Sequence, residues 1–107
     1  MVKIMYYIYM IRCSDNSIYT GITTDVERRF KEHTGKIPGK AAKYTGSRRA
    51  LSIEAVWQCD SREKASRLEF YIKKLIKYKK EQLIKDNTFF VKFFAEKVNC
   101  EEYERVK

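Results

Sequence analysis

Two segments decide the fold: residues 4–13 read Ile-Met-Tyr-Tyr-Ile-Tyr-Met-Ile-Arg-Cys, and residues 18–22 read Ile-Tyr-Thr-Gly-Ile. Both are rich in β-branched and aromatic residues, which is typical of well-packed strands. Between them, the polar cluster Ser14-Asp15-Asn16-Ser17 favours a tight turn. The sequence therefore predicts an antiparallel β-hairpin.

The length of this turn determines whether Tyr9 and Tyr19 lie on the same face of the hairpin. Side chains alternate along a strand, so one residue more or less in the turn reverses the face. A three-residue loop from Ser14 to Asn16, with Asn16 in the left-handed conformation, places both tyrosines on one face. A two-residue turn separates them, and both turns remain open at this point.

The segment after the hairpin predicts a helix and then a loop. Thr24-Asp25-Val26-Glu27 has the form of a capping box, so the helix should begin at Asp25 and run to about His33. The loop at residues 34–49 holds the only proline, three of the four glycines and five basic residues without an acidic one.

The second half of the chain predicts one more strand and more helix. Residues 51–59 resemble a third strand, and the sequence from Asp60 to Glu63 can cap a second helix. The apolar positions of that helix are Ala65, Leu68, Ile72, Leu75 and Ile76, and helical character resumes at residues 79–84. We expect an α+β (mixed α/β) domain with a small three-stranded, mostly antiparallel sheet flanked by helices, in the order β-β-α-β-α-α.

The length of 107 residues predicts one folded domain, at residues 1–95, and a charged C-terminal tail at residues 96–107. The tail holds four glutamates and is expected to be frayed. A cluster of four aromatic residues precedes it and predicts either core packing or a dimer contact: Phe89, Phe90, Phe93 and Phe94.

The chain is strongly basic, with 23 Lys and Arg against 14 Asp and Glu and a net charge of +9. Such a surface attracts polyanions, namely nucleic acid or an anionic membrane, although charge can also serve solubility alone. No segment approaches the ~18–20 apolar residues that span a bilayer. We therefore expect no membrane association. The three cysteines have no zinc-site spacing, which suits a reducing, cytoplasmic location. We expect the protein to be a monomer or a weak dimer.

Polar side chains flank the apolar stripes of both predicted helices. On a helical projection, Val26 and Phe30 anchor the first stripe, and Arg29 and His33 lie beside it. Glu69 lies at the edge of the stripe of the second helix. An acid in such a place is either paired or a metal ligand, because burying a bare carboxylate is costly.

These residue types suit phosphodiester hydrolysis. A hard divalent ion prefers carboxylate, water and phosphate oxygens, and an arginine offers a fixed fork to phosphate oxygens. A tyrosine with a pKa near ~10 is a poor base unless nearby cations lower that pKa. Simpler interpretations are that Arg29 pairs with Asp25 or Glu32, and that Glu69 pairs with Lys73.

The spacing of these residues resembles a known family. The sequence contains Tyr7-Ile8-Tyr9 and Tyr19-Thr20-Gly21, and Tyr9 lies ten residues before Tyr19. Arg29 and His33 follow Tyr19 by ten and fourteen residues. With Glu69 in the second helix, this pattern resembles the GIY-YIG nuclease superfamily over about residues 4–85. It is similar to the small standalone bacterial branch, which is related in sequence to structure-specific nucleases of the Slx type. The sequence departs from the pattern at Tyr7, where the family has glycine, and at Thr20.

The resemblance implies a metal-dependent endonuclease that hydrolyses phosphodiester bonds in DNA, with branched or damaged DNA as candidate substrates. It implies that Glu69 binds one Mg²⁺ or Mn²⁺ ion, that Arg29 holds the scissile phosphate, and that Tyr9 or Tyr19 orients or deprotonates the nucleophile. His33 would assist proton transfer or contact phosphate.

The alternative is a nucleic-acid-binding module without catalysis on the same scaffold. In both cases nucleic acid, with DNA favoured, is the expected partner. The residues expected to neutralise its phosphates are Lys36, Lys40, Lys43, Arg48 and Arg49.

Overall fold

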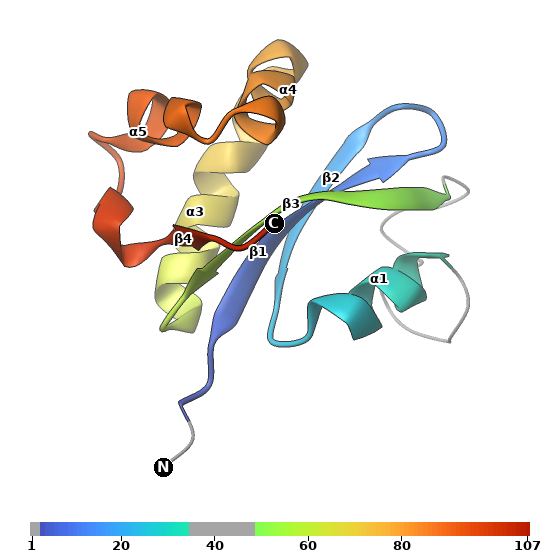
Figure 1. Ribbon diagram of the computed structural model, residues 1–107, viewed down its shortest axis with the longest axis horizontal. Coiled ribbons are helices and arrows are strands. Elements are labelled where there is room, and N and C mark those ends of the chain that lie inside the picture. Colours follow the sequence, from blue (N-terminus) through green and yellow to red (C-terminus); the bar gives the residue numbers. More distant parts are fainter. Residues whose placement is uncertain (1–2, 35–48) are drawn as a thin grey trace.

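The computed structural model describes residues 3–34 and 49–107, which form an antiparallel sheet flanked by helices (Figure 1). Within this part the sheet has four strands in the order β2-β1-β3-β4, so the expectation of three strands was one too few. The elements in chain order are β1 (Tyr6–Cys13), β2 (Ile18–Thr23), α1 (Val26–Thr34), β3 (Ala50–Cys59), α3 (Arg62–Lys73), α4 (Lys77–Lys85), α5 (Thr88–Phe94), the 3₁₀ helix η1 (Cys100–Glu102) and β4 (Glu104–Arg105).

The β1–β2 hairpin has the three-residue turn that places both tyrosines on one face. The amide of Cys13 donates to the carbonyl of Ser17 at 2.9 Å, and Asn16 has a φ of 70°, in the left-handed region that asparagine tolerates. In the resulting register Tyr9 faces Gly21 and Ile11 faces Tyr19. Tyr9 and Tyr19 are therefore diagonal neighbours, with ring centroids 6.2 Å apart.

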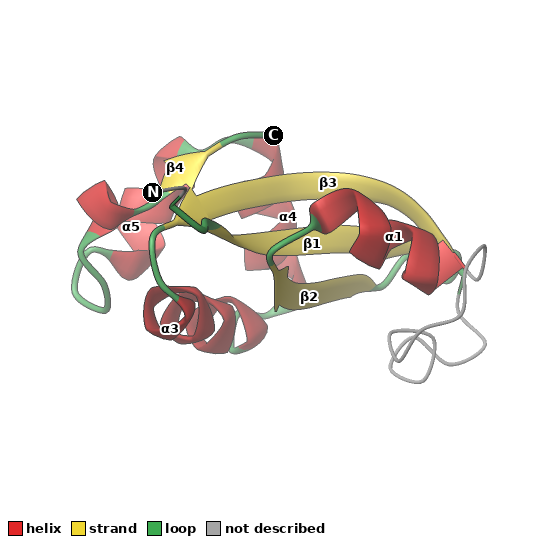
Figure 2. Cartoon of the chain, turned by 90° about the horizontal axis from the view of Figure 1, so that it is seen from below, coloured by secondary structure: helices red, strands yellow, loops and turns green. Residues whose placement is uncertain are grey.

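The alternation along β1 divides the core between the two faces of the sheet. Ile8 and Met10 point into the larger cluster, which α3, α4 and α5 cover. Tyr9 and Ile11 point to the other face, where they pack against Phe30 of α1. Figure 2 shows α1 set apart from α3 beside the sheet, and the edge strand β2 runs between them.

Two helix boundaries differ from the sequence expectation. Helix α1 begins at Val26, one residue later than predicted, because Asp25 is the cap, accepting from the Arg28 amide at 3.1 Å. Helix α3 ends at Lys73, so the predicted apolar positions Leu75 and Ile76 are not part of it. Leu75 still packs against the core, whereas Ile76 is 65% exposed. The cap of α3 agrees with the prediction, since Ser61 accepts from the Lys64 amide.

The phenylalanine cluster packs as part of the core. Phe90 and Phe94 are buried, and Phe89 and Phe93 stack on each other at its margin with ring centroids 5.4 Å apart. None of the helices in the described part of the chain is long and apolar enough to cross a membrane.

The C-terminal segment is ordered, contrary to the expectation that it frays. Arg105 in β4 pairs with Trp57 of β3, and its guanidinium donates to the carbonyls of Leu83 and Ile84 at 3.0 and 2.8 Å. Tyr103 is 9% exposed and donates its hydroxyl proton to the carbonyl of Lys64 at 2.6 Å. One buried aromatic side chain and one strand pairing thus outweigh the charged composition of the tail.

Replacing Tyr103 is expected to show how much this segment contributes. Tyr103→Phe should lower the free energy of unfolding by about 1 kcal/mol through the lost hydrogen bond. Tyr103→Ala should lower it by about 3 kcal/mol, because it also empties a packed site. Urea unfolding measures both, with the exposed Tyr78→Phe as control. Equal midpoints for all variants would show that the segment is not packed.

Arg12 joins the sheet to α4. Its guanidinium donates to both carboxylate oxygens of Glu81, at 2.5 and 2.7 Å, and to Glu54 at 2.9 Å. Glu54 stands at a shift in the β1–β3 register, where Met10 faces Ala55 but the next residue faces Ile53. The irregularity therefore accommodates a carboxylate beside Arg12.

The Arg12–Glu81 pair is expected to make stability depend on pH. The hydrogen bond from Arg12 lowers the pKa of Glu81 in the folded protein. The pair therefore stabilises the fold at pH values above the pKa of an unfolded glutamate, ~4.3, and this stabilisation is lost as the pH falls through the folded-state pKa of Glu81. Glu81→Gln should cost about 1 kcal/mol at pH 7, a cost that shrinks below about pH 5. Urea unfolding across this range, with Glu101→Gln as control, measures it. A cost independent of pH would contradict the assignment.

Candidate active site

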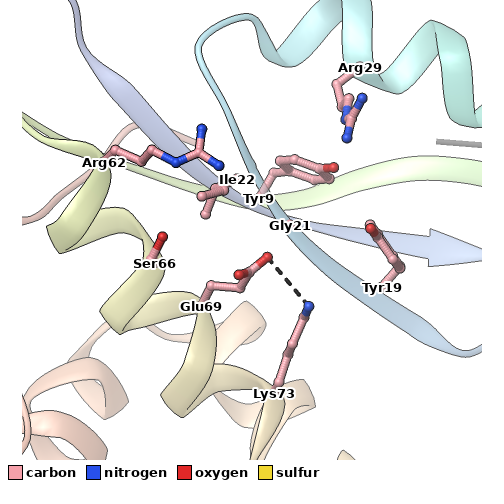
Figure 3. Close-up of a pocket in the computed structure, with 9 residues that line it drawn as sticks. All are labelled: Tyr9, Tyr19, Gly21, Ile22, Arg29, Arg62, Ser66, Glu69 and Lys73. Atoms are coloured by element: carbon pink, nitrogen blue, oxygen red, sulfur yellow. Dashed lines mark ion pairs between the residues drawn. The ribbon is translucent and has the colours of Figure 1, made fainter. Parts of the chain in front are cut away.

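An open cleft of about 480 Å³ lies where α1 and α3 flank the edge strand β2 (Figure 3). Its floor comes from the β1–β2 hairpin, and its two sides come from the helices. The lining residues are Tyr9, Tyr19, Gly21, Ile22, Arg29, Arg62, Ser66, Glu69 and Lys73. Four of the five predicted catalytic residues thus meet in one cleft.

Gly21 allows the Tyr9 ring to lie flat across β2. A methyl group on Gly21 would come within 2.4 Å of the Tyr9 hydroxyl oxygen and 2.6 Å of its Cζ atom. Such distances are far below van der Waals contact, so only glycine fits beneath this ring. Gly21 therefore positions Tyr9. The glycine is part of the Tyr19-Thr20-Gly21 motif, but its role is evident only in the structure.

Tyr9, which lines the cleft, forms a buried pair with His33, which does not line it. The Tyr9 hydroxyl lies 3.2 Å from His33 Nε2, and the two side chains are 1% and 3% exposed. Burial, and then the charge of Tyr19, raise the pKa of Tyr9 well above its usual range. Burial, and then the charge of Arg29, lower the pKa of His33 to about 4. His33 is therefore neutral near pH 7, and it fixes the direction of the Tyr9 hydroxyl without lining the cleft itself.

Arg29 presents a charged guanidinium beside the tyrosines. It donates to Glu32 at 3.2 Å, which is one of the two ion pairs considered from the sequence. Burial lowers the pKa of Arg29, but its contacts with Tyr9 and Glu32 outweigh this and leave the pKa raised. Its Nε atom is buried without a hydrogen-bond partner among the described residues. A buried donor of this kind is suited to an anionic ligand.

Glu69 faces the tyrosines from the α3 side of the cleft (Figure 3). Its side chain is 23% exposed, and one carboxylate oxygen lies 3.4 Å from the ammonium of Lys73, as the simpler interpretation proposed. Lys73 is 52% exposed and carries a long flexible stem, so it can move away from the carboxylate at little cost.

In the described part of the chain, the cleft offers a divalent ion one carboxylate and two phenol oxygens. Within the described residues no three His, Cys, Asp or Glu side chains cluster as a metal site, and Glu69 is the sole carboxylate lining the cleft. Mg²⁺ is commonly held by one or two carboxylates, with waters and substrate phosphate completing its shell. One accessible carboxylate beside phenol oxygens fits that requirement.

Helix α3 brings two further polar residues to the cleft, Arg62 and Ser66, which the sequence reasoning missed. Arg62, Ser66, Glu69 and Lys73 recur at intervals of four, three and four residues, which is the spacing of one helix face. This stripe runs beside the buried stripe of Ala65, Leu68 and Ile72. The spacing was readable in the sequence, but only the position of α3 against β2 shows that it faces the tyrosines.

The basic loop lies mostly outside the described residues, including Lys36, Lys40, Lys43 and Arg48. Arg49 is described and exposed. Its amide donates to the Ser14 hydroxyl at 3.1 Å and its carbonyl accepts from the Ser14 amide, which places it at the hairpin turn. It does not line the cleft.

The sequence is similar to a known domain family and to several bacterial proteins. The model of the GIY-YIG catalytic domain matches residues 5–82. The UPF0213 protein FN1575 of Fusobacterium nucleatum is 49% identical over 87 residues, covering 81% of this chain and 84% of that protein. The UPF0213 protein BH0048 of Halalkalibacterium halodurans is 47% identical over 79 residues, covering 74% and 81%.

A UPF0213 protein YhbQ of Salmonella typhimurium is 41% identical over 85 residues, covering 79% of this chain and 82% of that protein. Among solved structures, the solution NMR structure of BH0048 from Bacillus halodurans matches 76% of this chain and 83% of its own, with 41% identity and a TM-score of 0.46. The match to the GIY-YIG catalytic domain model, at residues 5–82, spans the hairpin, both cleft helices and most of α4. This chain therefore belongs to the GIY-YIG family.

Proposed function

We propose that this protein is a metal-dependent endonuclease that hydrolyses phosphodiester bonds in DNA. The observation that supports this most is the meeting of Tyr9, Tyr19, Arg29 and Glu69 in one cleft. These residues come from four elements, and a purely structural explanation of each would not require them to face one another.

Arg29 holds the phosphate that is cut. Its guanidinium stays protonated, lies beside both tyrosines, and has a buried Nε donor without a partner in the described part of the chain. A planar guanidinium can donate two parallel hydrogen bonds to phosphate oxygens, which fixes the phosphorus above the tyrosine pair. Glu32, one turn further along α1, is the ion-pair partner of Arg29.

The tyrosines orient the attacking water, and one of them accepts its proton. Tyr9 resists ionisation because it is buried, and a negative charge on Tyr19 makes it resist further. A charge on one phenol therefore opposes ionisation of the other. Tyr19 is the more accessible of the two, and His33 fixes the direction of the Tyr9 hydroxyl.

Glu69 is the residue that would hold Mg²⁺ or Mn²⁺. When bound, such an ion supplies positive charge that favours a phenolate or hydroxide and neutralises charge on the phosphate. Lys73, which is half-exposed and 3.4 Å from this carboxylate, would then be free to contact the substrate.

The Glu69–Lys73 ion pair also supports a second candidate function. A carboxylate already neutralised by lysine suits a module that binds nucleic acid without cutting it. In that case the cleft binds a phosphate through Arg29, and no divalent ion is needed.

A cleavage assay separates the two functions. Supercoiled plasmid, single-stranded DNA, branched DNA and RNA are incubated with Mg²⁺ or Mn²⁺, and binding is measured in parallel by fluorescence anisotropy. Cutting that depends on the metal supports the endonuclease. Binding without cutting on every substrate contradicts it and supports the module.

A further inference from the structure

Arg62 is a cation of the cleft whose charge is not used within the fold. It is exposed at the first turn of α3, and its guanidinium makes no hydrogen bond or ion pair with any other described residue. Two other arginines differ in this respect, because Arg12 binds Glu54 and Glu81, and Arg29 binds Glu32.

The placement of Arg62 separates it from Arg29. Arg29 comes from α1 and Arg62 from α3, and Figure 3 shows the two guanidinium groups on opposite sides of the Tyr9 ring. Arg62 extends toward Ile22, and the hydroxyl of Ser66, one turn further along α3, also points into the cleft. A single phosphate held by Arg29 beside the tyrosines would leave Arg62 and Ser66 without a ligand.

The charges of the lining fit more than one phosphate. Among the described residues the cleft has three cationic side chains, Arg29, Arg62 and Lys73, against the one carboxylate of Glu69. Nucleic acid carries one negative charge per nucleotide, so neighbouring phosphates of one strand arrive together.

We propose that Arg62 and Ser66 form a second phosphate subsite, which holds a phosphate next to the scissile one on the same nucleic-acid strand. The subsite rests on the proposed function and adds to it a requirement on substrate length. Arg62 supplies the charge and Ser66 a hydroxyl donor, and together they direct the strand along α3 across the tyrosine pair.

Binding of a short strand tests the subsite without cleavage. A fluorescent single-stranded tetranucleotide, as DNA and as RNA, is titrated in EDTA with wild type, Arg62→Ala and Arg67→Ala over a series of KCl concentrations. Arg67 is a matched control, since it is an exposed arginine of α3 outside the cleft. Arg62→Ala should weaken binding roughly tenfold and reduce the salt slope by about 0.7, whereas Arg67→Ala should match wild type.

Chemical neutralisation of single phosphates locates the contact. Tetranucleotides with one methylphosphonate at each position in turn remove one charge at a time. At one position the modification should weaken wild-type binding but add almost nothing to the loss in Arg62→Ala, because both changes remove the same contact. Unfolding midpoints of both variants show that the fold is intact.

Three outcomes would overturn the subsite: equal binding by Arg62→Ala and wild type, equal losses in Arg62→Ala and Arg67→Ala, or no measurable binding by wild type. The endonuclease fails by a different result, namely absence of metal-dependent cutting. If cutting occurs, Arg62→Ala should raise KM far more than it lowers kcat, since its contact is formed before the reaction begins.

Discussion

Glu69→Ala is expected to lower kcat/KM for metal-dependent cleavage by about a thousandfold, while binding in EDTA changes little. The reason is that Glu69 is the one carboxylate lining the cleft in the described part of the chain, so no neighbouring acid can hold the ion in its place. Glu69→Gln should behave in the same way, because it keeps the shape of the side chain but removes the charge.

The control for this result is Glu63→Ala. Glu63 is an exposed acid in the first turn of the same helix and lies outside the cleft, so its loss should leave cleavage unchanged. Cleavage rates and binding constants of the three variants are compared at equal metal concentration. Cleavage by Glu69→Ala at the wild-type rate would show that Glu69 does not bind the metal ion. Loss of binding together with cleavage would show that Glu69 supports the cleft structurally.

Gly21→Ala is expected to lower the free energy of unfolding by about 2 kcal/mol and to abolish most of the cleavage. The added methyl group would lie 2.4 Å from the Tyr9 hydroxyl oxygen, and the Tyr9 side chain is only 1% exposed. The ring must therefore move, and its hydrogen bond with His33 must break or shift. Urea unfolding measures the first effect, and the plasmid assay measures the second.

A double variant separates this contact from a general effect of alanine in a strand. In a Tyr9→Ala background the three atoms closest to the added methyl group are gone, so Gly21→Ala should cost less than about 0.5 kcal/mol there. The difference between the two costs is the Gly21–Tyr9 interaction. A cost that is the same in both backgrounds would show that the Tyr9 ring does not depend on Gly21.

Much of the site was predictable because it depends on short-range geometry. The turn residues allowed two hairpin registers, and the three-residue alternative with Asn16 in the left-handed conformation is the one observed. Helical periodicity placed Arg29 beside the buried face of α1, where it reaches the tyrosines. Glu69 was identified as an acid at the edge of a buried stripe, although Ile76, which helped to define that stripe, lies beyond the end of α3.

Errors arose where a local pattern competes with a distant contact. The glutamate-rich C-terminal segment favours fraying by composition, yet Tyr103 finds a buried site against Phe90 and β4 completes the sheet beside β3. Composition reports the cost of ordering a segment, but it does not report the packing that compensates for that cost.

By itself, then, the sequence determined the alternation of strands, the helix faces and the identity of the reactive side chains, because each depends on neighbours within about one turn or one hairpin. Tertiary structure alone decided that His33 is buried behind Tyr9, that Gly21 accommodates the tyrosine ring, and that the polar stripe of α3 faces the cleft. These features join residues 12 to 64 positions apart in the chain. Their energies come from desolvation and steric exclusion, which exist only once the helices have packed against the sheet.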